Sequence, residues 1–481
     1  RDRSPSRGLG DVYKRQLLSA TGDGSLARLA NPEYGVINPV DGSQPVPHQY
    51  YNDGKLTTQN VYLGGKWKTI LVGTTGRGQS RTVYALDITD TSVLADPDQA
   101  EDAILWERSA GDGETNADWI GMALGKPTIS LIKGIDNEGK WVVHMGNGPN
   151  SKLGKAALLQ FDLADGTLSV YKAGSMDSNG LAAPYVIQSD DSDGVSEYAF
   201  AGDLQGNVWR FDLGVGDSMK SELIYVARDK AENGTRQPIT GDMLATKNEK
   251  TGAIWVFFGT GRFLSKDSDV LTDSGVQTWY GLRAMKGPSG YAEVKSTHTR
   301  ANLKKREIVA EDETDGGVFR ATSNGEFSEV TGEKVGWYMD LISPDENKGK
   351  EGERIVYQTQ LIAGRLMVNT LIPESNNPCN TSPAGSTLIV DPFSGANPGE
   401  PVLDANGDKL VNTSDITEDG IYYNAQKHEV GVSGTFTGKR DQSGNIRLFG
   451  QGIDTSTVEI DTTGGAGAGN LERLNWHEII N

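Results

Sequence analysis

The residues most suited to binding a metal ion lie in the segment 189–197, SDDSDGVSE. Five oxygen donors stand at alternate positions there: the side chains of Ser189, Asp191 and Asp193, the carbonyl of Val195 and the carboxylate of Glu197. Gly194 stands where such a loop must turn sharply, and glycine allows that turn. Hard oxygen donors suit Ca²⁺ better than transition metals. The segment therefore predicts a calcium loop, and an acidic turn that binds no ion is the alternative.

A second segment, DANGDKLVNTSD at 404–415, has the same character. Its candidate ligands occupy loop positions one, three, five, seven, nine and twelve: Asp404, Asn406, Asp408, the carbonyl of Leu410, Asn412 and Asp415. Lys409 stands at the sixth position, where a calcium loop favours glycine. We therefore predict a weaker calcium site here, with a solvated polar turn as the alternative.

The composition places these loops in an acidic, β-rich protein. The chain has 481 residues, 61 glycines, 36% hydrophobic residues and few stretches of helical periodicity, which favours an all-β fold with many tight turns. A formal net charge of −19 leaves no basic stripe for phosphates, so nucleic acid is not an expected partner. No apolar run is long enough for a transmembrane segment. Cys379 is the only cysteine, which excludes an internal disulfide and cysteine-based zinc sites.

The first sixteen residues, RDRSPSRGLGDVYKRQ, differ from the rest of the chain. They are basic and lack periodicity, and the part SRGLGDVYKRQ matches one reading frame of a common transposase sequencing adapter. We therefore expect residues 1–16 to be an adapter artefact, and residues 17–481 to form one N-terminally truncated domain whose export signal is missing from this sequence. A basic targeting tail is the alternative.

One structural unit recurs from Leu17 onward. An apolar strand leads into a glycine-rich turn, and a second strand ends in an aromatic residue or leucine followed by Asp. The copies are Trp67–Thr89, Trp141–Gly166, Tyr198–Leu213 and Ile254–Leu282. Repeated hairpins without intervening helices predict a modified β-propeller, and a spacing of roughly fifty to seventy residues predicts long decorated loops. A stacked-hairpin or sandwich array is the competing fold.

Signals for catalysis are weak. The segment GTTGRGQS (Gly73–Ser80) resembles a phosphate loop, but the strand-like RTVYALDI follows it instead of a helix. The five histidines form no HExxH motif, and no GxSxG elbow is present. His144 lies in a β-run, where a packed or edge position is expected. We therefore predict a protein that is not an enzyme.

Eight motifs occur in the order found in one known family. They are GTTGRGQSRTVYALDIT, GNGPNS, DGVSEYAFAGDLQGNVWRFDL, FFGTGRFL, GWYMDL, GERI, TLIPESNNPC and RLNWHEII. Together they resemble the C-terminal β-propeller domain of the PilY family of type IV pilus biogenesis factors and tip adhesins. The resemblance covers nearly the whole chain from Leu17.

The resemblance implies a calcium-binding protein of the bacterial fimbrium. Its calcium state would regulate pilus extension and retraction, and hence twitching motility and surface attachment. The implied partners are minor pilins, the type IV pilus machinery and a host or abiotic surface, and the implied location is the cell surface, at the pilus tip, outer membrane or periplasm. The family's loop has Asp at positions one and nine, where this chain has Ser189 and Glu197, and a register shift would bring in Asp190.

Two other functions remain open. A quinoprotein-type dehydrogenase that uses the cofactor PQQ can have a similar propeller with calcium beside the quinone. The single cysteine cannot supply the vicinal disulfide that many of these enzymes contain. A structural propeller whose loops bind no ion is the third interpretation.

Overall fold

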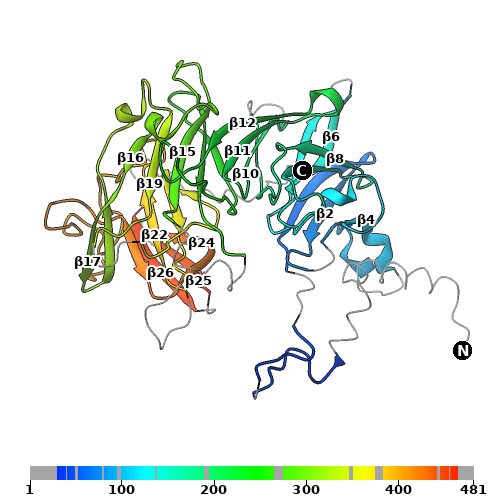
Figure 1. Cartoon of the computed structure of the whole chain (residues 1–481), viewed down its shortest axis with the longest axis horizontal. Coiled ribbons are helices and arrows are strands. Elements are labelled where there is room, and N and C mark those ends of the chain that lie inside the picture. Colours follow the sequence, from blue (N-terminus) through cyan, green and yellow to red (C-terminus); the bar gives the residue numbers. More distant parts are fainter. Residues whose placement is uncertain are drawn as a thin grey trace, which may run out of the picture. The chain divides into compact units, whose positions relative to one another are not determined.

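The computed structural model consists mainly of β-strands joined by loops and short 3₁₀-helices (Figure 1). It describes residues 30–39, 41–48, 53–78, 81–94, 99–135, 138–188, 194–264, 275–345, 350–373, 383–440, 445–453 and 456–463. The chain divides into two compact units, Arg1–Leu223 and Ile224–Asn481, and each has a hydrophobic core. Within the described ranges, no helix has the length and apolar character needed to span a membrane.

Residues 56–226, which extend three residues past the first unit, form three four-stranded sheets whose strands neighbour one another in chain order. The first sheet is β1 (Leu56–Leu63), β2 (Lys66–Thr74), β3 (Thr82–Asp87) and β4 (Ile104–Ser109). The second is β5 (Thr128–Lys133), β6 (Gly139–Gly146), β7 (Ala157–Asp162) and β8 (Leu168–Lys172). The third is β9 (Tyr185–Ile187), β10 (Tyr198–Gly202), β11 (Asn207–Asp212) and β12 (Lys220–Val226). Consecutive antiparallel meanders of this kind are typical of propeller blades.

A buried aromatic stack joins the first two sheets. Trp106 of β4 stacks on Phe161 of β7, with ring centroids 5.5 Å apart. The indole Nε1 of Trp106 donates a hydrogen bond of 2.9 Å to the carbonyl of Leu163. Burying each ring contributes roughly 2 kcal/mol, and the hydrogen bond fixes the orientation of the indole. The stack therefore sets the position of one sheet against the next.

A buried carboxylate organises the turn between β10 and β11. Asp203 is fully buried, and its Oδ1 accepts hydrogen bonds of 2.9 Å from the amides of Gln205 and Asn207. Its Oδ2 accepts from the side chains of Asn179 (3.0 Å), Asn207 (2.8 Å) and Trp209 (2.9 Å). The sequence GDLQGN therefore folds around one acceptor group whose hydrogen-bonding capacity is heavily used.

The second unit has a less regular strand order. A five-stranded sheet has the order β13 (Leu244–Lys247), β14 (Ile254–Gly259), β15 (Thr278–Met285), β19 (Gly336–Asp340) and β16 (Lys304–Arg306), in which β16 is parallel to β19. A six-stranded sheet has the order β17 (Ile308–Thr314), β18 (Gly317–Thr322), β23 (Ala425–His428), β22 (Gly385–Val390), β21 (Arg365–Asn369) and β20 (Gln360–Ile362). A third sheet contains β24 (Val432–Arg440), β25 (Asn445–Gly452) and β26 (Thr457–Thr463).

The connecting 3₁₀-helices are all short. In the described ranges they are η2 (Thr91–Leu94), η3 (Ala100–Ala103), η4 (Ala117–Trp119), η6 (Gly216–Ser218), η7 (Arg300–Asn302) and η8 (Phe327–Val330). None of them exceeds four residues, so the loops and not helices connect the sheets.

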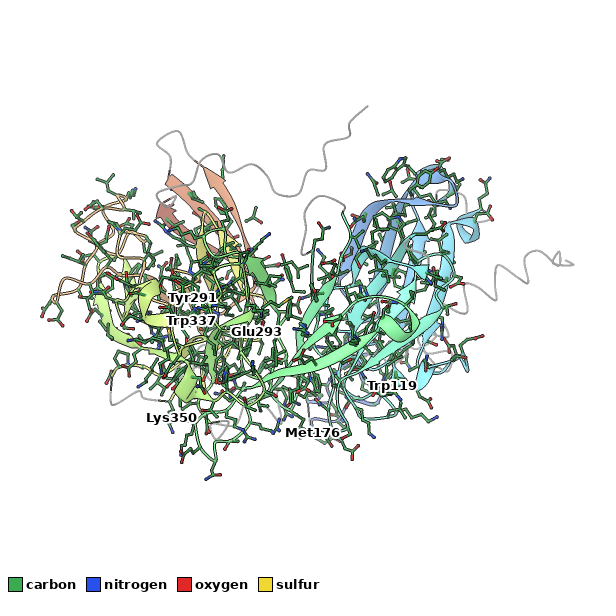
Figure 2. The ribbon with its side chains drawn as sticks, turned by 90° about the horizontal axis from the view of Figure 1, so that it is seen from above. Trp119, Met176, Tyr291, Glu293, Trp337 and Lys350 are labelled. Carbon is green, nitrogen blue, oxygen red and sulfur yellow. The ribbon has the colours of Figure 1, made fainter. Side chains whose placement is uncertain are left out.

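Trp337, labelled in Figure 2, lies in the core of the second unit. Its ring packs edge-to-face against Trp279 with centroids 5.4 Å apart, and its Nε1 donates to the carbonyl of Pro392 at 2.9 Å. Gly281 and Gly395 lie against the indole, where a Cβ at either position would collide with it. The indole of Trp337 therefore fits in the core only because both of these neighbouring positions are glycine.

A buried ionic cluster also lies in the second unit. The guanidinium of Arg320 contacts Glu311 at 2.7 Å and Glu353 at 2.8 Å, and all three side chains are almost completely buried. Glu351 lies 3.3 Å from Arg320 and 2.9 Å from Lys427. Two cations from β18 and β23 therefore offset most of the charge of three carboxylates, one from β17 and two from the segment 351–353.

The predicted hairpins are present in the structure. The segments Trp67–Thr89, Trp141–Gly166, Tyr198–Leu213 and Ile254–Leu282 correspond to β2–β3, β6–β7, β10–β11 and β14–β15. Strand β2 ends at Thr74, inside the GTTGRGQS segment, and β3 begins at Thr82, so a strand and not a helix follows this segment, as predicted. The parallel pairing of β16 with β19 was not predicted, because β16 has only three residues and no sequence periodicity.

Candidate functional site

The first candidate calcium loop connects β9 to β10. Ser189, Asp191 and Asp193 lie outside the described residues, so their prediction as ligands stays a prediction. Both ends of the loop are described. Ile187 pairs with Tyr198 where β9 and β10 meet, which brings the two ends of the loop together.

The end of this loop is held by neighbouring strands. Gly194 has a φ of +70°, the left-handed conformation that a sharp turn uses. Val195 forms a parallel bridge to Leu131 of β5. Glu197 is half-buried; its amide donates to the carbonyl of Ile187 at 3.2 Å. The last two predicted ligands are therefore part of the sheet framework.

The second candidate loop, between β22 and β23, is described throughout. Asp404 accepts from the amides of Gly407 (2.9 Å) and Lys409 (2.8 Å). The side-chain oxygen of Asn406 accepts from the amide of Asp408 at 3.0 Å. Asp408 in turn accepts from the amide of Leu410 at 2.7 Å. The candidate ligands at positions one, three and five therefore fold the backbone into successive turns.

Asp415 closes the base of the loop. It is buried, and its Oδ1 accepts from the amides of Ala405 (2.8 Å) and Asn406 (3.2 Å). Its Oδ2 accepts from the amide of Asn412 at 2.8 Å. The carboxylate thus joins the two ends of the loop, a role that sequence position alone did not indicate.

The remaining two candidates lie at the outer part of the loop. Leu410 is 59% exposed, and its carbonyl accepts from the side-chain amide of Asn412 at 3.4 Å. The side-chain oxygen of Asn412 accepts from both the amide and the hydroxyl of Ser414. The Leu410 carbonyl retains one free acceptor site, whereas both lone pairs of the Asn412 side-chain oxygen are used, so Ser414 would have to release it for a metal.

The sixth position of the loop has the geometry of a glycine although it is a lysine. Lys409 has a φ of +67°, a conformation that costs an ordinary residue about 1–2 kcal/mol. The loop therefore reaches the sharp turn that a calcium loop needs, with strain at this one residue.

The electrostatics of the loop favour a cation. Burial raises the pKa of Asp404, and the charges of Asp415 and Asp408 raise it further, whereas hydrogen bonds from the amides of Lys409 and Gly407 lower it. Three carboxylates are therefore near enough to repel one another. Across the described residues, however, no three His, Cys, Asp or Glu side chains form a group placed to hold a metal. A metal here would have to be held largely by Asp404, Asp408, amide oxygens and the Leu410 carbonyl.

His144 belongs to a buried polar network in the first unit. Its Nδ1 lies 2.9 Å from the Ser130 hydroxyl and its Nε2 lies 2.9 Å from Oε1 of Gln160. Tyr171 donates to the same Gln160 oxygen at 2.9 Å, and Gln160 donates to the carbonyl of Gly214 at 3.1 Å. Burial lowers the pKa of His144 to about 4. The histidine is packed, as expected, and its complete burial gives a substrate no access to it.

The model of the PilY1 beta-propeller domain matches residues 39–323, more than half of the chain. The chain belongs to the PilY1 beta-propeller domain family. The first candidate loop lies inside the matched range and the second lies beyond it. The family prediction made from the eight motifs is therefore confirmed.

Curated relatives carry the same family name. The chain is 32% identical over 440 residues to a type IV pilus biogenesis factor PilY1 homolog of Xylella fastidiosa, which covers 90% of this chain and 32% of the relative. It is 28% identical over 480 residues to type IV pilus biogenesis factor PilY1 of Pseudomonas aeruginosa, covering 91% and 38%. The chain thus spans about a third of the length of these PilY1 relatives.

A solved structure has the same fold. The crystal structure of the Pseudomonas aeruginosa PilY1 C-terminal domain matches with a TM-score of 0.67 at 24% sequence identity. The match covers 85% of this chain and 83% of that one. The predicted all-β propeller is therefore confirmed.

Proposed function

We propose that this PilY1-type propeller is a calcium-binding assembly factor of type IV pili and a tip-associated adhesin. The family match over residues 39–323 is the observation that carries the pilus role. The relatives are named biogenesis factors, which favours a role in assembly over catalysis. The partners on this proposal are minor pilins, the pilus machinery and a host or abiotic surface. The location is the bacterial cell surface, at the pilus tip, outer membrane or periplasm.

The calcium part of the proposal rests on the donor chemistry of the two loops. In the first, Ser189, Asp191, Asp193, the Val195 carbonyl and Glu197 would hold the ion. In the second, the donors would be Asp404, Asn406, Asp408, the Leu410 carbonyl and Asn412, with Asp415 closing the loop base. The oxygen-only donor set fits Ca²⁺.

A calcium ion, when bound, would supply positive charge that offsets the repulsion among the carboxylates. Without calcium, the raised pKa of Asp404 indicates that the charged form of this carboxylate is disfavoured in the second loop. Calcium state would therefore change how firmly each loop is ordered, and a loop at the surface can pass that change to a bound partner. This is how calcium would regulate pilus extension, retraction and attachment.

Calorimetric titration of the full chain with CaCl₂ tests the calcium proposal. Asp193→Ala should abolish binding at the first loop, and Asp408→Ala should abolish binding at the second. Asp419→Ala is the matched control, because Asp419 is an exposed carboxylate beyond the second loop. Absence of heat and of any thermal shift at millimolar calcium would contradict the proposal while leaving the family assignment intact.

The pilus role has a separate test. A strain lacking its own copy of the gene would be complemented with the wild type, Asp193→Ala or Asp408→Ala. Surface pili and twitching zones would then be measured with and without a calcium chelator. If all three proteins restore pili and twitching to the same level, both in calcium and in chelator, calcium binding at these loops has no part in the pilus role.

A further inference from the structure

The second unit contains a surface cavity of about 760 Å³ to which the pilus role assigns nothing. Its size falls within the range of small-molecule sites in proteins. Three segments distant in sequence form it, and the lining residues are Asn324, Gly325, Glu326, Glu329, Asn397, Pro398, Gly399, Gly420 and Tyr422.

The wall of the cavity is fixed by a buried asparagine. Asn397 donates its side-chain amide to the carbonyl of Tyr422 at 2.7 Å and to that of Thr322 at 3.4 Å. Its side-chain oxygen accepts from the amide of Gly399 at 3.0 Å. One buried side chain therefore connects two of the lining segments to strand β18, so the cavity is preformed.

The floor of the cavity is polar. Behind Gly325 lies Arg306, which is 2% exposed and donates to Glu329 at 2.8 Å and to the carbonyl of Ser394 at 2.9 Å. Its buried Nη2 has no hydrogen-bond partner among the described residues. A Cβ at Gly325 would collide with the guanidinium and with the Glu329 carboxylate. The glycine therefore lets the cavity approach an ionic pair closely.

The charged side chains that line the cavity are carboxylates. Glu329 is neutralised by Lys304 (2.6 Å) and Arg306 (2.8 Å), whose hydrogen bonds lower its pKa to about 2. Glu326 adds an exposed carboxylate to the rim. The lining contains no lysine or arginine, which disfavours phosphates and sialic acids. Pro398 is its only aliphatic side chain, which disfavours lipids and other apolar ligands.

The remaining chemistry matches a polyhydroxylated neutral ligand. The exposed carboxylate of Glu326 can accept strong, charge-assisted hydrogen bonds from the hydroxyl groups of a ligand. The Asn324 side-chain amide can both donate and accept. Among the lining residues, half-buried Tyr422 and Pro398 have the side chains suited to packing against the C–H face of a sugar ring. We propose that this cavity binds a neutral saccharide, which goes beyond the pilus role and does not depend on calcium binding.

Saturation-transfer difference NMR on the full chain tests the proposal. The probes are the methyl glycosides of glucose, galactose and N-acetylglucosamine, with N-acetylneuraminic acid as the anionic comparison. We expect transfer to at least one neutral glycoside. Tyr422→Ala should reduce its affinity at least about tenfold, while Tyr62→Ala, an exposed aromatic residue on β1 of the first unit, should leave it unchanged.

Glu326→Gln keeps the proposal testable if Tyr422→Ala fails to fold, because Glu326 is exposed and its replacement by glutamine preserves shape. This variant should also weaken binding, and melting curves of all variants establish that they are folded. The proposal is overturned by absence of transfer to any neutral glycoside. It is equally overturned by transfer that both variants leave unchanged, or by a preference for N-acetylneuraminic acid.

Discussion

Replacing Asp203 with alanine should destabilise the first unit strongly. The carboxylate accepts five hydrogen bonds and is fully buried. Its removal leaves the side-chain donors of Asn179, Asn207 and Trp209 without this acceptor. Each buried donor left unsatisfied costs about 1–3 kcal/mol, and partial relaxation of the turn recovers some of that. We therefore expect a loss of roughly 3–5 kcal/mol, which is large for a single substitution.

Differential scanning calorimetry and urea unfolding measure this loss. For a unit of this size, it corresponds to a fall in melting temperature of roughly 10 °C. Asp118→Ala is the matched control, because Asp118 is 45% exposed and its ion pair in the described part of the chain is with the exposed Lys152 at 3.0 Å. An exposed pair of this kind contributes at most about 1 kcal/mol.

Asp203→Asn separates the acceptor chemistry from volume. Asparagine has the same shape and can keep the two backbone amide bonds, but its NH₂ group would then face three donors. We expect it to destabilise nearly as much as alanine. If both variants melt within a degree or two of the wild type, the turn does not depend on this carboxylate, and the reasoning from buried hydrogen bonds is wrong.

Acidification should destabilise both units, because burial lowers the pKa of His144 and of His428 to about 4. A histidine in the unfolded chain binds a proton near pH 6.5, so the stability that these two neutral histidines contribute is fully present above pH 6.5 and is lost between pH 6.5 and 4. Melting temperatures measured across this range test the prediction, and a melting temperature that does not change with pH would contradict it. Arg320→Met should lower the free energy of unfolding by about 3–5 kcal/mol, because it leaves Glu353 buried without its charge partner. In urea unfolding, the double variant with Glu353→Gln should recover part of this loss. If it recovers none, the two residues are not coupled. Lys409→Gly should stabilise the second unit by about 1 kcal/mol, since it relieves the left-handed strain, and it should tighten calcium binding in calorimetry by removing a neighbouring positive charge. If the Lys409→Gly protein is less stable than the wild type, the backbone at Lys409 is not strained.

The hairpins were predictable from the sequence because the signals for them are local. In Tyr198–Leu213, the apolar run YAFA and the strand-like VWRFDL flank a Gly-Asp-Leu-Gln-Gly-Asn turn, and the two strands pair where this pattern predicts them. The family assignment was also accessible, since some of its motifs coincide with these hairpins. The details of the Asp203 turn were less accessible, because Asn179 contributes from another loop.

Contacts between distant segments could not be predicted in the same way. Arg320 and Glu353 are 33 positions apart and lie in different strands or loops, so no periodicity relates them. The lining of the cavity comes from three loop segments around 325, 398 and 421, whose glycines and asparagines indicate only turns. The spacing of residues 404–415 likewise identified oxygen donors, but it could not distinguish Asp415, which holds the backbone, from Asp408, which lies exposed.

The second loop and the cavity share one short segment, so the two proposed sites, each able to bind without the other, are connected through the backbone in a way that can be tested. Asp415, at the base of the loop, accepts at its carbonyl from the amide of Tyr423 at 3.1 Å, and Ile416 bridges Tyr422. Gly420 and Tyr422 of the same segment line the cavity. If calcium orders the loop, it must also restrict this wall, and the linkage is reciprocal: a bound saccharide would then tighten calcium to the same extent. Repeating the glycoside titration in calcium and in EDTA measures this coupling; equal affinities in the two conditions would show that the segment transmits nothing between the sites.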